Sequence, residues 1–273
     1  MKYAIISDIH GNFPAFSAVL EDAKAQGVDE FLMLGDYVNG FPWGNEVMEL
    51  IRTLKPAVII RGNGEDYIIN LSNKDQIDWK KEQFKPVYWA YRSLSHENLD
   101  YLTSLPKAAV ISYMRNEIHL NHSMNIFYRF PKVELFHSSK FRVIMKTAPL
   151  SHEEYLVSAR KALLSRPDAL SAIHALPKGI YLFGHNHIQF HMEYEGRLFV
   201  NPGSCGEPFD CSTTAAYTIL EYTDNHWVVM EQRVKYDLKA VIDELRTSSF
   251  FSYAPKWCKV LERELTTGEK IRF

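Results

Sequence analysis

Residues 3–10 read YAIISDIH, an apolar run that ends in an Asp-x-His pair. Two similar runs follow, FLML at residues 31–34 and VII at residues 58–60, and apolar residues recur at helical spacing between them. Strand-like runs that alternate with helical patterns are typical of βαβ units, in which crossover helices join parallel strands. The first sixty residues therefore predict an α/β fold built on a sheet with parallel strands.

Two helical insertions are expected in the middle of the chain. Residues from about 66 to 105 are helical in pattern and rich in aromatic side chains, and a second insertion is expected at about 127–178. A strand is predicted between them at residues 117–121. We interpret residues 1–273 as a single domain in which both insertions act as caps over one face of the sheet.

Strands return in the last third of the chain. Five strand-like runs between residues 179 and 234 predict a succession of hairpins, with turns at Glu195-Gly196 and Asp224-Asn225. Two helices, at about 237–245 and 254–265, are expected to close the chain.

Composition narrows the class of protein. With 46% hydrophobic residues and a net charge of −2, the chain can bury a large core and has no charge bias toward nucleic acid or membranes. Its first apolar run is too short for a signal peptide, and no stretch is apolar enough to span a bilayer. The three cysteines lack CxxC spacing, so they predict packing rather than disulfides or a zinc knuckle. We expect a cytoplasmic protein without a membrane or stable nucleic-acid partner, and the oligomeric state stays open.

Side chains that bind metals follow the strand-like runs. They are Asp8, His10, Asp36, Asn63, His122, His185 and His187. Each of these short motifs is common by itself, because Gly-Asp and Gly-Asn pairs often form turns and a single histidine often has a structural role. Side chains at the carboxyl ends of strands converge at one edge of an α/β sheet, however, and carboxylates mixed with imidazoles suit Mn²⁺, Fe²⁺ or Zn²⁺. Their joint, ordered occurrence predicts a site for two divalent ions.

The motifs SDIHG (7–11), LGDYVNG (34–40), RGNGED (61–66), LNHS (120–123), FGHNH (183–187) and VNPGS (200–204) occur in this order. The set resembles the calcineurin-like metallophosphoesterase superfamily over nearly the whole chain. Within it, the chain is most similar to the small group related to diadenosine tetraphosphatases and compact phosphodiesterases. The resemblance implies a four-layer α/β/β/α sandwich, in which two mixed sheets are flanked by helices. The helical pattern of the insertions adds a helical cap to this fold.

The resemblance also implies how the ligands divide. The first ion would be bound by Asp8, His10, Asp36 and His187, and the second by Asp36, Asn63, His122 and His185. Asp36 would bridge the ions, and Asp36, Asn63 and His122 would take part in catalysis. His119 is the alternative to His122, but it is expected within the strand. Two transition-metal ions are expected, Mn²⁺ first, with Fe²⁺, Ni²⁺ or Zn²⁺ as alternatives.

Two departures from the family pattern bear on the substrate. Members that cleave monoesters commonly carry a histidine after the Gly-Asn pair, where this chain has Gly64. Glycine offers no proton donor for a poor alkoxide leaving group, whereas a phosphate leaving group can depart without one. Protein Ser/Thr phosphatases carry Asp and a phosphate-binding arginine where this chain has Asn39 and Gly40.

These departures favour hydrolysis of a phosphodiester or a phosphoanhydride. A dinucleoside polyphosphate such as diadenosine tetraphosphate is the leading substrate, so the expected partner is a small phosphorylated molecule, most simply a nucleotide. Asn12 and Arg61 are candidate phosphate contacts, although Asn12 could serve a turn and Arg61 a surface ion pair. Ser/Thr phosphatase or other monoesterase activity, and a non-catalytic scaffold of the same fold, are the alternatives.

Aromatic side chains in the first insertion allow a further interpretation. They are Trp79, Phe84, Tyr88, Trp89 and Tyr91. Such a group could stack on a nucleobase, but aromatic residues at helical spacing more often pack into a core.

Overall fold

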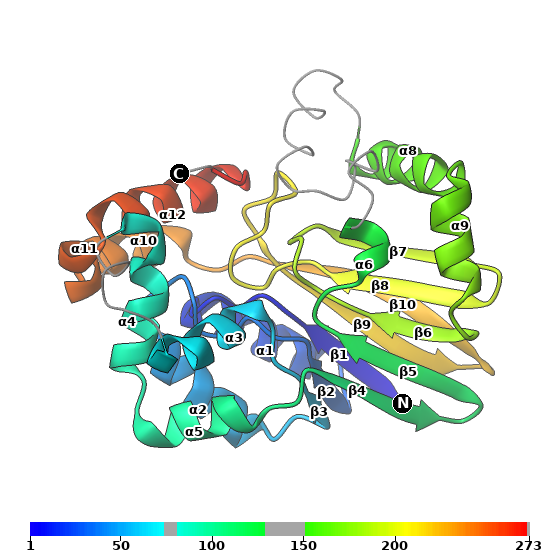
Figure 1. Cartoon of the computed structure of the whole chain (residues 1–273), viewed down its shortest axis with the longest axis horizontal. Coiled ribbons are helices and arrows are strands. Elements are labelled where there is room, and N and C mark those ends of the chain that lie inside the picture. The colour runs from blue at the N-terminus through cyan, green and yellow to red at the C-terminus, as the bar shows by residue number, and fades with distance from the viewer. Residues whose placement is uncertain (74–80, 129–150, 272–273) are drawn as a thin grey trace.

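The computed structural model describes residues 1–73, 81–128 and 151–271, and these residues form two mixed five-stranded sheets (Figure 1). In spatial order, the first sheet holds β10 (His226–Val234), β9 (Ala215–Thr223), β1 (Lys2–Ile6), β2 (Glu30–Met33) and β3 (Val58–Ile59). The second holds β4 (Ala108–Tyr113), β5 (Asn116–Asn121), β6 (Gly179–Leu182), β8 (Arg197–Pro202) and β7 (Gln189–Tyr194). The predicted α/β class and its two mixed sheets are confirmed.

The inner strands β1, β2 and β6 are apolar on both faces, as expected for strands that are covered on both sides. In β1, Tyr3 and Ile5 face the second sheet, whereas Ala4 and Ile6 face the helices. In β6, Ile180 and Leu182 join the core between the sheets, and Tyr181 packs outward. Alternation with a period of two thus fills a central core and two outer cores.

Helices cover the outer faces of both sheets, as Figure 1 shows. The first sheet is covered by α1 (Phe13–Ala25), α2 (Gly44–Leu54), α3 (Asn63–Ile69), α4 (Lys85–Ser93) and α5 (His96–Ser104), with the short 3₁₀ turns η1 (Asn70–Asn73) and η3 (Glu82–Phe84) between α3 and α4. The second is covered by α6 (Asn125–Tyr128), α8 (His152–Leu164) and α9 (Pro167–His174). Both predicted insertions therefore contain helices, and their role as caps stays a prediction because residues 129–150 lie outside the described residues.

The chain closes with three helices that pack beside α4. They are α10 (Leu238–Thr247), α11 (Ser249–Tyr253) and α12 (Pro255–Thr267). Their apolar faces form one cluster with Phe41 and Trp43, which lie on the loop after β2. None of the helices in the described ranges has both the length and the hydropathy that a bilayer-spanning segment requires.

The prediction of hairpins in succession was only partly right. The turns at Glu195-Gly196 and Asp224-Asn225 are present, and their positive φ angles are those of tight hairpins. However, β6 pairs in parallel with β8, and β7 lies beyond β8 at the sheet edge. The last five strands also divide between the two sheets. Strand β4 and helix α11 were not predicted.

Candidate metal centre

The loops after β1 and β2 run side by side and bring three predicted ligands together. The N–H of Asp8 donates to the carbonyl of Gly35 at 3.0 Å, and the N–H of His10 donates to the carbonyl of Asp36 at 2.9 Å. These bonds continue the parallel pairing of β1 with β2 beyond the strand ends. The side chains of Asp8, His10 and Asp36 consequently meet at the carboxyl edge of the first sheet, as the spacing of the motifs predicts.

Five of the predicted ligands have left-handed backbone conformations. Their φ angles are 54° for Asp8, 54° for His10, 56° for Asp36, 73° for His185 and 61° for His187. Non-glycine residues rarely adopt this region, at a cost on the order of 1–3 kcal/mol each, and such strain collects at functional sites. The surrounding hydrogen bonds therefore hold these residues in a geometry that aims their side chains inward.

The predicted ligands form two groups. Asp8, His10 and His187 make one, and Asp36, His122 and His185 make the other, with the ligand atoms of each group within 4.8 Å of one another. Asp36 links the two groups, because its Oδ2 lies 3.8 Å from His10 Nε2 and 3.4 Å from His122 Nε2. This is the placement expected of a carboxylate that bridges two cations.

Asn63 completes the second group. It is the first residue of α3, and its Oδ1 lies 3.2 Å from His122 Nε2. The other carboxylate oxygen of Asp36, Oδ1, accepts the N–H of Gly64 at 2.7 Å, which leaves Oδ2 to face the imidazoles. All seven predicted ligands thus meet in one cluster.

Three of the imidazoles are oriented by main-chain carbonyls. Their Nδ1 atoms contact the carbonyls of Asn39 (from His10, 2.5 Å), Glu207 (from His187, 2.5 Å) and Leu34 (from His122, 2.8 Å). A carbonyl only accepts, so each Nδ1 carries the proton and each Nε2 points toward the centre of the cluster. Hydrogen bonds of this kind commonly orient histidines that bind metals.

Two features of the cluster would be stabilised by bound cations. In neutral His10 and His187 the unprotonated Nε2 atoms face each other at 3.1 Å, a contact that is unfavourable unless a cation or proton lies between the lone pairs. Asp8 Oδ1 is fully buried and lies 3.3 Å from His187 Nε2, so that with neutral imidazoles it has no hydrogen-bond donor in the described residues, which is costly for a buried carboxylate oxygen. The donor set of carboxylates, an amide and imidazoles suits a divalent transition metal.

The pKa values in the metal-free chain lead to the same conclusion. Burial by itself would raise the pKa of Asp36, but the charge and hydrogen bond of His122 lower it to about 2. Burial opposes protonation of His10 and His122, yet the neighbouring carboxylates raise the pKa of these histidines to about 9 and about 10. Burial and then the charge of His122 lower the pKa of His185 to about 4. Protons on two imidazoles thus balance the carboxylates, a balance that metal ions would supply in their place.

A carboxylate that we did not predict supports the loop of Asp36. Glu65 is fully buried, and its two oxygens accept the N–H groups of Asp36, Tyr37 and Gly62, each at 2.8 Å. Burial, followed by the charge of Asp36, raises the pKa of Glu65, and these three donors oppose that rise. The sequence contained a signal for this role, because Glu65 follows Gly62 at the spacing of a capping box.

The loop that contains His185 and His187 rests on the NPGS turn. The side-chain amide of Asn201 donates to the carbonyl of Gly184 at 2.8 Å, and the hydroxyl of Ser204 donates to the carbonyl of Asp8 at 2.7 Å. Gly184 is required by close approach, since a Cβ atom there would lie 2.4 Å from Asp8 Oδ2. His187 also stacks on Phe209 with ring centroids 4.4 Å apart, a contact that sequence gave no reason to expect.

The two predicted phosphate contacts have structural partners. Asn12 is fully buried and caps α1, with Oδ1 accepting the N–H of Ala15 and Nδ2 donating to a main-chain carbonyl. Arg61 pairs with Asp66 at 2.9 Å and donates to the carbonyl of Leu105 at 2.7 Å. The turn and ion-pair alternatives describe these arrangements, and the geometry lends no support to a phosphate contact by either residue.

The remaining candidate residues are His119, Cys205 and the aromatic side chains of the first insertion. His119 lies within β5, stacks on Tyr181 and belongs to neither metal group in the described residues, which favours His122 as the ligand. Cys205 is buried and likewise belongs to neither group. Tyr88, Trp89 and Tyr91 pack into apolar clusters, which agrees with the core interpretation, whereas Phe84 is exposed; Trp79 lies outside the described residues.

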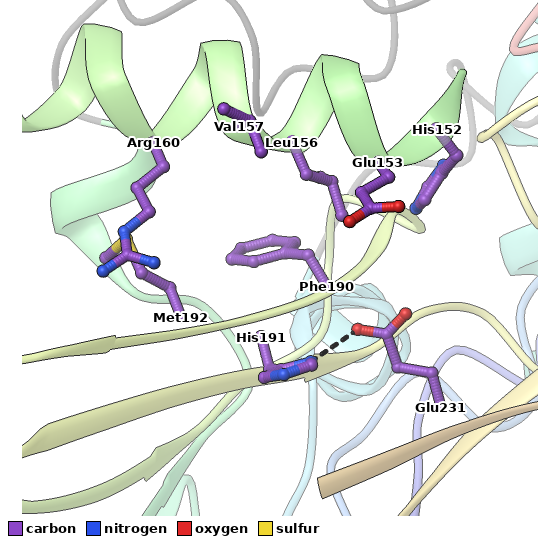
Figure 2. Close-up of a pocket in the computed structure, with 9 residues that line it drawn as sticks. All are labelled: His152, Glu153, Leu156, Val157, Arg160, Phe190, His191, Met192 and Glu231. Carbon is purple, nitrogen blue, oxygen red and sulfur yellow. Dashed lines mark hydrogen bonds and ion pairs between the residues drawn. The ribbon is translucent and has the colours of Figure 1, made fainter.

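A separate pocket of about 330 Å³ lies between α8 and the edge strands β7 and β10 (Figure 2). His191 of β7 and Glu231 of β10 meet there at 2.8 Å, so this contact joins the two sheets at their edges. Leu156 and Phe190 line its apolar part. None of the predicted metal ligands lines it, and we therefore do not place the chemistry there.

Comparisons with known proteins identify the family. A model of the calcineurin-like phosphoesterase family matches residues 1–203. The chain belongs to this family. An uncharacterized protein of Methanocaldococcus jannaschii is 28% identical over 258 residues, which cover 89% of this chain and 90% of that protein.

Two solved structures have a similar fold. A metallophosphoesterase from Sphaerobacter thermophilus is 24% identical, with 98% of this chain and 99% of that chain covered and a TM-score of 0.68. A hypothetical protein from Pyrococcus horikoshii is 19% identical, with 99% of both chains covered and a TM-score of 0.67. At these identities the likeness concerns the fold, and it confirms the predicted α/β architecture.

Proposed function

We propose that this family member hydrolyses phosphodiester or phosphoanhydride bonds with two divalent cations, and that a dinucleoside polyphosphate such as diadenosine tetraphosphate is its leading substrate. Mn²⁺ is the proposed ion, and a cytoplasmic location with a small phosphorylated partner is part of the proposal. The observation that carries it is the surroundings of Asp36, where seven ligands converge and no side-chain acid stands at residue 64.

The chain's own residues hold and orient the reacting groups. Asp36 Oδ2 faces both metal groups, and its loop is fixed by Glu65. Three of the four imidazoles, those of His10, His122 and His187, are held by carbonyls, so their Nε2 atoms point inward without further ordering. When bound, the two cations supply Lewis acidity that lowers the pKa of a nearby water and offsets charge on the phosphoryl oxygens.

The geometry at two glycines supports a substrate other than a phosphoserine protein. A Cβ atom at Gly64 would lie 3.0 Å from Asp36 Oδ1, so a histidine there would press on the bridging carboxylate. A Cβ atom at Gly40 would lie 2.8 Å from the carbonyl of His10, so an arginine there would require the loop to move. Groups that protonate an alkoxide or clamp a monoester are therefore missing from both positions, and leaving groups of low pKa are favoured.

The test is an activity screen of the full chain reconstituted with Mn²⁺. The substrates are bis(p-nitrophenyl) phosphate, diadenosine tetraphosphate and a phosphoserine peptide. We expect hydrolysis of the first two at rates well above that of the peptide, and loss of this activity in Asp36→Asn. His119→Gln is the matched control, because His119 lies outside both metal groups. Preference for the phosphopeptide would overturn the proposal.

A further inference from the structure

A second pocket lies beside the metal centre, between α3, η3 and α4. It has a volume of about 290 Å³, and its lining includes Asn39, Tyr67, Gln83, Phe84, Val87 and Tyr88. This size, near the lower end for ligand pockets, fits one ring system rather than a whole dinucleotide. We propose that it binds the base of a nucleotide whose phosphate lies at the metal centre, an inference that rests on the proposed function.

The pocket adjoins the centre through two residues. Tyr67 lies four residues after the predicted ligand Asn63 on α3, so the two share one helix face, with Cβ atoms about 5–6 Å apart. The carbonyl of Asn39 accepts a hydrogen bond from His10 Nδ1. The Cβ atom of Asn39 would lie 3.5 Å from a Cβ atom placed on Gly64. Because Gly64 has no side chain, nothing from that position separates the pocket from Asp36.

The aromatic side chains of this pocket are unusual in being open to solvent. Tyr67 is 52% exposed and Phe84 is 37% exposed, and no other Phe, Tyr or Trp is exposed among those whose side chains the structure describes. Packing against the rest of the protein explains the presence of the other aromatic rings, but it does not explain these two exposed rings. Exposed rings beside a phosphate-handling centre provide the surfaces on which bases stack.

Polar groups of the pocket suit a base better than a plain hydrocarbon ring. The side-chain amides of Asn39 and Gln83 make no hydrogen bond to another residue in the described ranges, so their donors and acceptors are open to a ligand. The ammonium of Lys81 lies 5.9 Å from the centre of the Phe84 ring. Aromatic faces, two amides and a nearby cation together match a base that carries a phosphate.

The test measures binding to the Mn²⁺-loaded full chain by titration calorimetry. The two ligands are adenosine 5′-monophosphate and ribose 5-phosphate, which share the sugar phosphate and differ only in the base. We expect the nucleotide to bind about 5- to 150-fold more tightly, the range that stacking of one base gives. In Tyr67→Leu most of this preference should disappear while ribose 5-phosphate binds as before. Gln83→Ala should lower the preference by a smaller factor.

Met114→Ala is the matched control, because Met114 is 66% exposed and lies away from this pocket, in the turn between β4 and β5. Equal affinity for the two ligands would overturn the base pocket, even if the enzyme hydrolyses diesters. An equal loss of both ligands in Tyr67→Leu would also overturn it, because the damage would then lie at the metal centre. A base preference without hydrolysis of any diester or anhydride would keep the pocket and refute the proposed function.

Discussion

Glu65 should be essential for holding the bridging carboxylate, although it is not a predicted ligand. Its oxygens accept three buried N–H groups at 2.8 Å each. In Glu65→Ala all three donors lose their acceptor, and a buried donor without one costs about 1–3 kcal/mol. We therefore expect the free energy of unfolding to fall by at least about 3 kcal/mol. In Glu65→Gln one oxygen becomes an NH₂ group that faces a donor, so the expected loss is about 1–3 kcal/mol.

The assay is urea unfolding at pH 7, with and without Mn²⁺, followed by calorimetric titration of the metal. Because the N–H of Asp36 is one of the three donors, both variants should also bind Mn²⁺ more weakly. Glu46→Gln is the matched control, since Glu46 also lies in the first turn of a helix but is exposed. If Glu65→Ala unfolds within about 0.5 kcal/mol of the control and binds Mn²⁺ normally, the supporting role is refuted.

Three further predictions concern the cluster itself. Gly184→Ala places a Cβ atom 2.4 Å from Asp8 Oδ2. Thermal unfolding should therefore show that the free energy of unfolding falls by about 1–3 kcal/mol. An unchanged melting temperature would contradict this, because the loop would then have moved at no cost. In the metal-free chain the pKa values of His10 and His122 are raised to about 9 and about 10. The protonated histidines therefore stabilise the fold fully below about pH 6.5, and this stabilisation is lost as the pH rises through 9–10. The urea midpoint of chelated protein should therefore fall between pH 7 and 10, and a rise would contradict this. His122→Gln should lower the bound Mn²⁺ measured by elemental analysis, whereas His119→Gln should not; equal losses would reopen the choice between these histidines.

Sequence predicted that the candidate metal ligands converge, because these residues lie where apolar runs end. Asp8 and Asp36 follow β1 and β2, whose runs are buried on both faces and therefore easy to recognise. Parallel pairing then determines that these ends meet. The helix and strand bounds agree within a few residues for the same reason, since burial and periodicity are local properties of the chain.

Sequence could not predict which strands pair when the partners are distant in the chain. The runs of β6, β7 and β8 are consistent with a hairpin succession, and only tertiary packing places β8 next to β6. Left-handed backbone at His185 is likewise invisible in the sequence, because only a small fraction of non-glycine residues adopt it, even though histidine is enriched among them. The pocket of Tyr67 and Phe84 joins α3 to η3, so no single motif encodes it.

The most direct test of the central claim is anomalous diffraction from crystals of the full chain soaked in Mn²⁺. Two anomalous peaks about 3.5–4 Å apart are expected, with Asp36 between them and the groups of Asp8 and His122 on either side. Absence of density at this cluster, or manganese bound only elsewhere, would contradict the claim that these side chains hold a pair of cations.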